Sequence, residues 1–222
     1  MRARTAVTAT ALAAATALTL TACGGGSGGG GDKISTSPST SAATAAPTTS
    51  SPASGSRIVL DPSVKLPAGL KLDFAWSTPS DPAQKAALTA TANFMQSMVH
   101  GVVEQNPKDG SLYGFATDSA LTYAKTYVQN HVSAKRTLTG TDDFYRPVVK
   151  LGAKSTVAEV TFCENDAKLY AKDLSTGKVD TTPAGDDSYT SYDIVLAKMP
   201  TQAELWQARS VTYKERAVQC KQ

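Results

Sequence analysis

The sequence predicts an α+β domain in which N-terminal helices pack on one face of a curved antiparallel sheet of three to five strands. Two segments with a helical period of apolar residues come first, and segments with strand-like alternation follow them. Helices and strands do not alternate along the chain, which argues against a doubly wound parallel sheet. Every Phe, Tyr and Trp lies between Phe74 and Tyr213, so the core is expected within residues 58–222.

The first predicted strand and helix have clear local signals. Residues 70–76 alternate between apolar and mostly polar side chains, as a half-buried strand does. Ser80 or Asp81 can cap the next helix, and Pro82 suits its first turn. Before Asn106-Pro107 ends this helix, its apolar face is expected to hold Leu88, Ala92, Met95, Val99 and Val102.

A second helix is predicted from Thr117 or Asp118 to about Ser133, and strands are predicted beyond it. Apolar residues of this helix recur on one face at Leu121, Ala124, Val128 and Val132. Strands are expected at 144–151, 158–162, 192–196 and 205–213, with a short run at 169–170 before a turn at 175–177. Pro147 indicates an edge position or a bulge.

The first 22 residues have the features of a lipoprotein signal peptide. Arg2 and Arg4 precede an apolar stretch that is short for a spanning helix, which needs about 20 apolar residues. Leu20-Thr21-Ala22-Cys23 then matches a bacterial lipobox. Cleavage is expected between Ala22 and Cys23, with a diacylglycerol on the Cys23 sulfur. The alternative is an ordinary secretory signal.

Residues 23–57 are predicted to tether the domain to the extracytoplasmic face of the cell membrane. After Cys23 they consist mainly of Gly, Ser, Thr, Ala and Pro, which cannot form a core. Residues 58–222 hold 18 Lys and Arg and 18 Asp and Glu, so the domain is neutral. A neutral domain without a basic run predicts no nucleic-acid partner.

With Cys23 lipidated, Cys163 and Cys220 form an even pair in an exported chain. Such a pair predicts a disulfide, with two buried free thiols as the alternative. The bond would hold the C-terminal tail on the strand that carries Cys163. It would also make the last strand a neighbour of that strand.

Several motifs together resemble those of actinobacterial, Streptomyces-type lipoproteins of unknown function with an NTF2-like (SnoaL-like) domain. They are the lipobox, Leu70–Trp76, Thr139–Pro147, Val160–Asn165, Thr176–Val179 and Gln219-Cys220. The resemblance implies a cone in which a curved sheet wraps a long helix around a cavity. Such cones include ketosteroid-isomerase-like enzymes, polyketide cyclases and non-catalytic modules, so the fold alone does not choose a function.

Few residues in the sequence suggest chemistry, and no catalytic residue, metal ligand or cofactor is predicted. His100 and Glu104 are four residues apart but lack a third ligand, so a helix-surface hydrogen bond is favoured over a metal site. His131 is expected to be partly buried at a helix end. The pairs Asp142-Asp143 and Asp186-Asp187 are expected in solvated turns.

A ketosteroid-isomerase-like site would need a carboxylate that faces an acidic hydrogen-bond donor inside the cavity. Asp118 is one candidate for it, and the candidate pocket residues are Tyr113, Tyr127, His131 and Tyr145.

Two functions are therefore considered. One is a non-catalytic binding or scaffolding module for a small hydrophobic ligand or an envelope protein. The alternative is an isomerase- or cyclase-type enzyme acting on a small hydrophobic molecule. A buried carboxylate beside a Tyr or His in the cavity would favour the enzyme, and an apolar cavity would favour the module.

Overall fold

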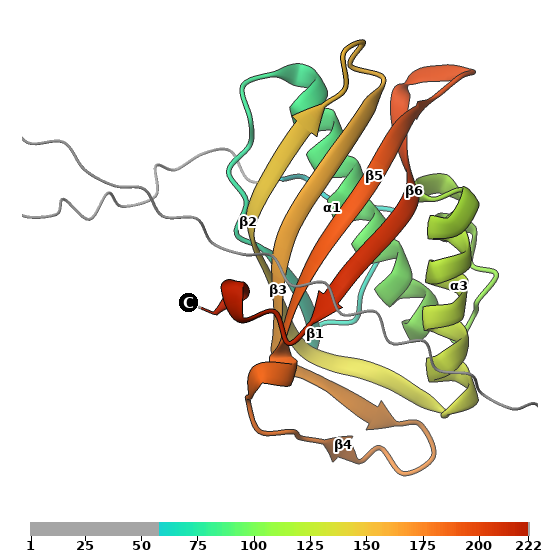
Figure 1. Cartoon of the computed structure of the whole chain (residues 1–222). Helices are drawn as coiled ribbons and strands as arrows, with labels where there is room; N and C mark the ends of the chain where they lie inside the picture. The colour runs from blue at the N-terminus through green and yellow to red at the C-terminus, as the bar shows by residue number, and fades with distance from the viewer. Residues whose placement is uncertain (1–57, 222) are drawn as a thin grey trace, which may run out of the picture. The chain divides into compact units, whose positions relative to one another are not determined.

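Three helices and a six-stranded sheet form the domain in the computed structural model, which describes residues 58–221 (Figure 1). The lipobox and residues 1–57 lie outside the described residues. The helices are α1 (Pro82–Val103), α2 (Gly110–Phe115) and α3 (Asp118–Ser133). The strands are β1 (Leu70–Phe74), β2 (Arg136–Leu151), β3 (Val157–Asp173), β4 (Val179–Asp180), β5 (Tyr189–Met199) and β6 (Gln202–Glu215).

The strand order in the sheet is β1-β2-β3-β5-β6, and β4 pairs with β3. The predicted α+β class is confirmed, although the sheet has six strands rather than three to five. It is also mixed, because β1 runs parallel to β2. The three helices separate β1 from β2 in the chain, and this long connection lets β2 start at the same end as β1. The run at 169–170 is part of the long strand β3.

Helix α1 begins where its local signals predict. The Asp81 side chain accepts a hydrogen bond from the backbone N–H of Gln84, and Pro82 is in the first turn. Figure 1 shows α1 and α3 on one face of the sheet, which curves around them. The core between them includes a chain of aromatic rings in contact. The Phe74 ring centroid is 4.7 Å from that of Trp76 and 4.7 Å from that of Phe144.

The predicted disulfide between Cys163 and Cys220 is confirmed, with their Cα atoms 5.5 Å apart. Cys163 lies in the middle of β3, and Cys220 belongs to a short C-terminal turn, η2 (Val218–Cys220). The expectation that the last strand neighbours β3 is wrong, because β5 lies between β3 and β6. The tail after β6 instead crosses β5 on the face opposite the helices (Figure 1).

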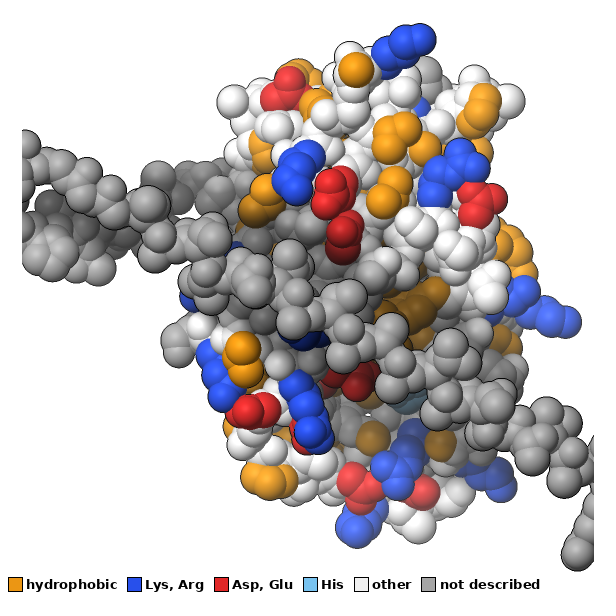
Figure 2. Space-filling model, in the orientation of Figure 1, with side chains coloured by type: hydrophobic (Ala, Val, Ile, Leu, Met, Phe, Trp, Pro, Cys, Tyr) orange, Lys and Arg blue, Asp and Glu red, His pale blue; other side chains and the backbone are white. Residues whose placement is uncertain are grey.

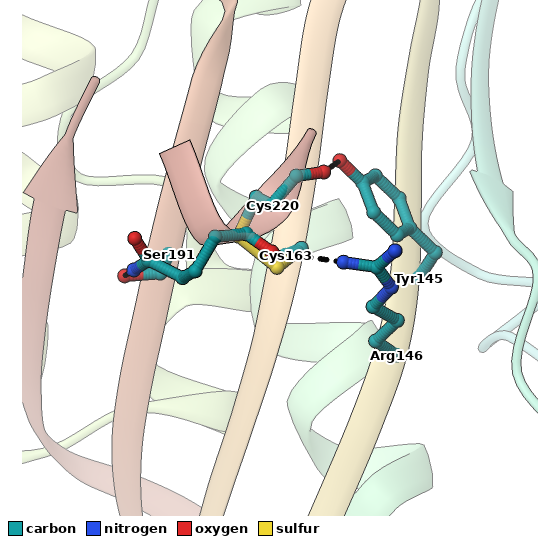
Figure 3. Close-up of a disulfide and its surroundings, with 6 residues drawn as sticks. Tyr145, Arg146, Cys163, Ser191 and Cys220 are labelled. Carbon is teal, nitrogen blue, oxygen red and sulfur yellow. Dashed lines mark hydrogen bonds between the residues drawn. A yellow bond between two sulfur atoms is a disulfide. The ribbon is translucent and has the colours of Figure 1, made fainter. Parts of the chain in front are cut away.

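Two further hydrogen bonds hold the tail near the disulfide. The Tyr145 hydroxyl donates to the carbonyl oxygen of Cys220, and Arg146 Nη1 donates to the carbonyl oxygen of Gln219 at 2.8 Å. Figure 3 shows both groups reaching from β2 to the turn that carries Cys220. Tyr145, Cys163, Ala217 and Cys220 thus form a small buried cluster separate from the main core.

Charges of both signs are interspersed on the uncovered part of the face in Figure 2, with hydrophobic side chains between them. This distribution fits the neutral composition of residues 58–222. Within residues 58–221, no helix is long and apolar enough to cross a membrane.

Candidate functional site

A cavity of about 620 Å³ lies between the helices and the inner face of the sheet. One side of it is apolar and comes mainly from α1 and β3, with Met95, Met98, Val99 and Leu169. The other side carries tyrosines and carboxylates. A pocket of this size with a few convergent polar groups can enclose a small organic molecule.

The acidic part of the cavity is built at a β-bulge between β2 and β3. Thr141 pairs with Lys168 and Asp143 pairs with Asn165, so residues 166 and 167 together face Asp142 alone. A bulge of this kind bends the strand and redirects side chains. Here Asp142 from β2 and Glu164 and Asp166 from β3 all line the cavity.

Gly140 allows the two strands to approach closely just before the bulge. Its φ is +100°, and a Cβ at this position would be 2.1 Å from the backbone oxygen of Lys168. Only glycine adopts this conformation without strain and leaves the space free. The Gly140 backbone therefore helps to set the position of Asp142, two residues later.

Asp142 and Glu164 form a buried carboxyl pair. Asp142 is 3% exposed and Glu164 is 8% exposed. Burial raises the pKa of Asp142 well above its ordinary value, and the Glu164 charge adds to this rise. Burial also raises the pKa of Glu164 to about 7, with a further contribution from Asp166.

Hydrogen bonds decide which member of the pair holds the proton more tightly. Glu164 accepts hydrogen bonds from Asp142, Tyr192 and Thr190, and these bonds oppose the rise in its pKa. The bond between the two carboxyls raises the pKa of Asp142, as expected for the donor. At neutral pH Asp142 is therefore the protonated donor, and Glu164 is the acceptor that titrates.

Four tyrosines of the described residues line the same cavity as this pair. Tyr123 and Tyr127 come from α3, Tyr192 from β5 and Tyr213 from β6. Burial raises the pKa of Tyr123 to about 12 and that of Tyr192 well above 10. Both phenols are thus hydrogen-bond donors at neutral pH. The ring centroids of Tyr123 and Tyr213 are 5.6 Å apart.

Of the four pocket residues expected from the sequence, Tyr127 and His131 lie together, with ring centroids 4.7 Å apart, and Tyr113 and Tyr145 lie elsewhere. Tyr127 lines the cavity. His131 is the next residue on the same helix face, and its Nδ1 is 3.0 Å from the carbonyl oxygen of Tyr127, but its side chain is not part of the lining. Tyr113 is 46% exposed on α2, and Tyr145 contacts Cys220 outside the cavity.

The other candidate residues also have new positions. His100 Nδ1 lies 3.3 Å from Asp109 Oδ1, so the polar partner of His100 is Asp109 and not the expected Glu104. Asp118, on the surface, accepts a hydrogen bond from Arg209 Nε at 2.7 Å. Within residues 58–221, no three His, Cys, Asp or Glu side chains are placed to hold a metal ion.

Of the two aspartate pairs, Asp186-Asp187 is exposed as expected, and its members pair with Lys221 and Arg216. The prediction for Asp142 is wrong. Its residue pair was expected in a solvated turn, but it lies within β2, and Asp142 is buried at the bulge. The buried position of Asp142 was not predicted, because two consecutive aspartates are far commoner in exposed turns than in a core.

Glu164, Tyr192 and Tyr123 were not predicted as site residues, although the sequence contains a signal for the first two. Ala158, Val160 and Phe162 are the inward residues of β3, and continuing their period of two reaches Glu164. In β5, Tyr192 has the same phase as the buried Ile194 and Leu196. A carboxylate and a phenol in the inward phase of neighbouring strands indicate a polar site inside the fold.

No protein-family model and no curated protein matches the sequence. Three solved structures are similar over 60% of this chain. The intermembrane space region of the chloroplast protein ARC6 has a TM-score of 0.39 and 10% identity, over 96% of that chain. An NTF2-like superfamily protein from Salmonella enterica serovar Typhimurium has a TM-score of 0.38 and 14% identity, over 90% of that chain.

The third structure is a candidate ketosteroid isomerase from Shewanella frigidimarina, with a TM-score of 0.34 and 14% identity over 97% of that chain. These likenesses concern the fold and assign no chemistry to the cavity.

Proposed function

We propose that this domain binds a small organic molecule in the cavity, in contact with the Asp142–Glu164 pair. The buried pair carries the proposal. Burying two carboxyl groups is unfavourable, and apolar residues at these positions would make a more stable core. Costly polar groups that converge on a cavity are typical of binding and catalytic sites.

The cavity has the general composition of a ligand site. Its volume of about 620 Å³ accommodates a molecule larger than a single aromatic ring. Met95 and Met98 offer an adaptable apolar surface on one side, and the carboxyls and phenols offer directional contacts on the other. A protein that only provided a scaffold would not need such a polar interior.

We also propose that the domain acts at the extracytoplasmic face of the cell membrane, anchored through Cys23. The lipobox Leu20–Cys23 supports this location. The Cys163–Cys220 disulfide supports it independently, because disulfides persist in oxidising compartments outside the cytoplasm.

Proton transfer is the second candidate function, and the state of the carboxyl pair favours it. A carboxylate with a pKa of about 7 is suited to act as a general base near neutral pH. Beside it, protonated Asp142 and the Tyr192 phenol are donors that could stabilise an anion formed on the substrate. A buried carboxylate beside a Tyr was the feature expected of an enzyme, so this arrangement favours catalysis over scaffolding.

Native mass spectrometry of the full-length protein tests the binding proposal. We expect a co-purified small molecule with the wild type. Leu169→Trp, which fills the cavity, should abolish this adduct. The matched control Leu174→Trp changes a 48% exposed leucine and should retain it. A wild type without a bound molecule, or an adduct that persists in Leu169→Trp, would contradict the proposal.

Proton exchange then separates binding from catalysis. The identified ligand is incubated with the protein in D₂O and followed by NMR. An enzyme should exchange a C–H proton of the ligand, and Glu164→Gln should abolish the exchange. A non-catalytic module should return the ligand unlabelled.

A further inference from the structure

We infer that the ligand of this cavity is an organic cation, a protonated amine attached to an apolar body. The inference rests on the proposed function and names the chemical class of its ligand. The charged side chains of the cavity are its first support. Five carboxyl residues line it: Asp142, Glu164, Asp166, Asp187 and Glu215. Among residues 58–221, Arg216 is the one basic residue in this lining, and Asp187 already pairs with it.

Asp142 provides a second and independent observation. Its Oδ1 is buried and has no hydrogen-bond partner within the described part of the chain. A buried acceptor without a donor is unfavourable by about 1–3 kcal/mol, and native proteins rarely leave one. Since Asp142 lines the cavity, a donor group on a ligand bound there would lie beside this carboxyl group. An ammonium group has N–H donors and no acceptor, which fits this need.

The remaining walls suit the rest of such a molecule. Tyr123, Tyr127 and Tyr213 bring phenol rings to the cavity, and the face of an aromatic ring attracts a cation. Met98 and Val99 from α1 form an apolar surface for the hydrocarbon part. The excess of carboxyl groups disfavours an anionic ligand. A metal ion fits poorly, because residues 58–221 contain no set of three ligands placed to hold one.

Titration of the carboxyl pair agrees with a cationic ligand. Burial keeps Asp142 protonated and leaves Glu164 partly protonated near pH 7, and a bound cation would favour the ionised forms of both. Binding should therefore release protons and become tighter as the pH rises from about 6 to 8, where an alkylamine stays protonated. Asp166 on β3, Asp187, Glu215 on β6 and Arg216 also border this region, and Asp166 has a raised pKa that acts in the same direction.

Isothermal titration of the full-length protein with three matched probes tests the inference. The probes are 4-phenylbutylamine, 4-phenylbutanol and 4-phenylbutyrate, which share an apolar body and differ in charge. At pH 7.5 we expect the amine to bind at least ten-fold more tightly than the alcohol, and the carboxylate to bind least. Titration in buffers of different ionisation enthalpy should show proton release with the amine alone.

Variants connect the effect to the carboxyl pair. Asp142→Asn and Glu164→Gln should each weaken amine binding at least ten-fold and alter alcohol binding much less. Each variant replaces a buried ionisable group by a neutral amide of similar size, so the domain should remain folded. Circular dichroism checks this. The control Glu159→Gln alters a carboxylate of the same strand whose Oε1 is 3.6 Å from Lys150 Nζ, and it should bind the amine as the wild type does.

Other outcomes would overturn the inference. Equal binding of alcohol and amine, preference for the carboxylate, or no binding of any probe would each refute a cationic ligand. So would amine binding that both pair variants retain, or a Ca²⁺ titration that displaces the amine. A neutral molecule found by native mass spectrometry would refute this inference and leave the binding proposal standing.

Discussion

Glu164 carries a carboxyl group whose environment differs sharply between the folded and the unfolded chain. Its pKa rises from 4.5 to about 7 in the fold, chiefly through burial. The folded state thus holds this proton more tightly than the unfolded chain does. The protonated Glu164 side chain therefore contributes fully to the free energy of unfolding below pH 4.5, and this contribution is lost as the pH rises through 7. The shift corresponds to about 3 kcal/mol at pH 8.

We therefore predict that Glu164→Gln removes this part of the pH dependence. Thermal unfolding followed by circular dichroism between pH 4.5 and 8 should show a flatter Tm profile, with the variant more stable than the wild type at pH 8. Glu159→Gln, on the same strand, is the control and should keep the wild-type slope. A Glu164→Gln profile parallel to that of the wild type would contradict the buried, titrating carboxyl.

Gly140 is the second residue with a clear individual role. Gly140→Ala would place a Cβ 2.1 Å from the Lys168 backbone oxygen in a left-handed conformation. We expect it to lower the free energy of unfolding by more than about 1 kcal/mol in urea denaturation. Gly114→Ala is the control, because its Cβ would meet nothing within 4 Å. Equal stability of the two variants would show that β2 and β3 separate easily at the bulge.

At the scale of elements, local sequence was enough for the two long helices, whereas the short helix α2 was not predicted. Asp81 and Pro82 begin α1 with side-chain and φ preferences that act within one turn, and the predicted start agrees with the structure. Pro147 lies where the pairing of β2 with β3 shifts between Tyr145 and Val148, as its missing N–H predicts. Such features depend on a few neighbouring residues and can be read directly.

The strand order could not be predicted in the same way. Pairing of β1 with β2 joins residues about 70 positions apart, and nothing in either strand specifies a parallel partner. The site depends on the pairing of β2 with β3 and on its bulge, which sets Asp142 against Glu164 and Asp166. Tyr127 was found because its helix could be predicted, whereas the carboxyl pair required the register and the bulge of β2 and β3.

The Cys163–Cys220 disulfide is expected to stabilise the C-terminal turn η2. In Cys220→Ser the turn η2 loses its covalent tie to β3, and a chain end without such a tie tends to fray. Urea unfolding should show a loss of about 2–5 kcal/mol relative to the oxidised wild type. Wild-type protein unfolded in reductant is the control and should match the variant. Alkylation of both thiols in unreduced, exported protein would contradict the bond.

At the scale of the whole chain, the proposed membrane location depends on residues before the domain. We predict that Cys23→Ser prevents lipidation, because the sulfur of the lipobox cysteine is the acylation site. Metabolic labelling with a fatty acid, followed by membrane fractionation, should mark the wild type and not the variant. Cys163→Ser is the control and should still be labelled. Equal labelling of Cys23→Ser and the wild type would refute the anchor.

Cys163 and Glu164 are consecutive residues of β3, so their side chains leave the strand on opposite faces. A slip of one residue in the pairing of β3 would turn the sulfur inward and the carboxylate outward. Cys220 lies on the outer face, and a slipped strand could not reach it. Under the proposed location outside the cytoplasm, the disulfide would therefore form only in chains whose β3 is aligned so that Glu164 faces the cavity.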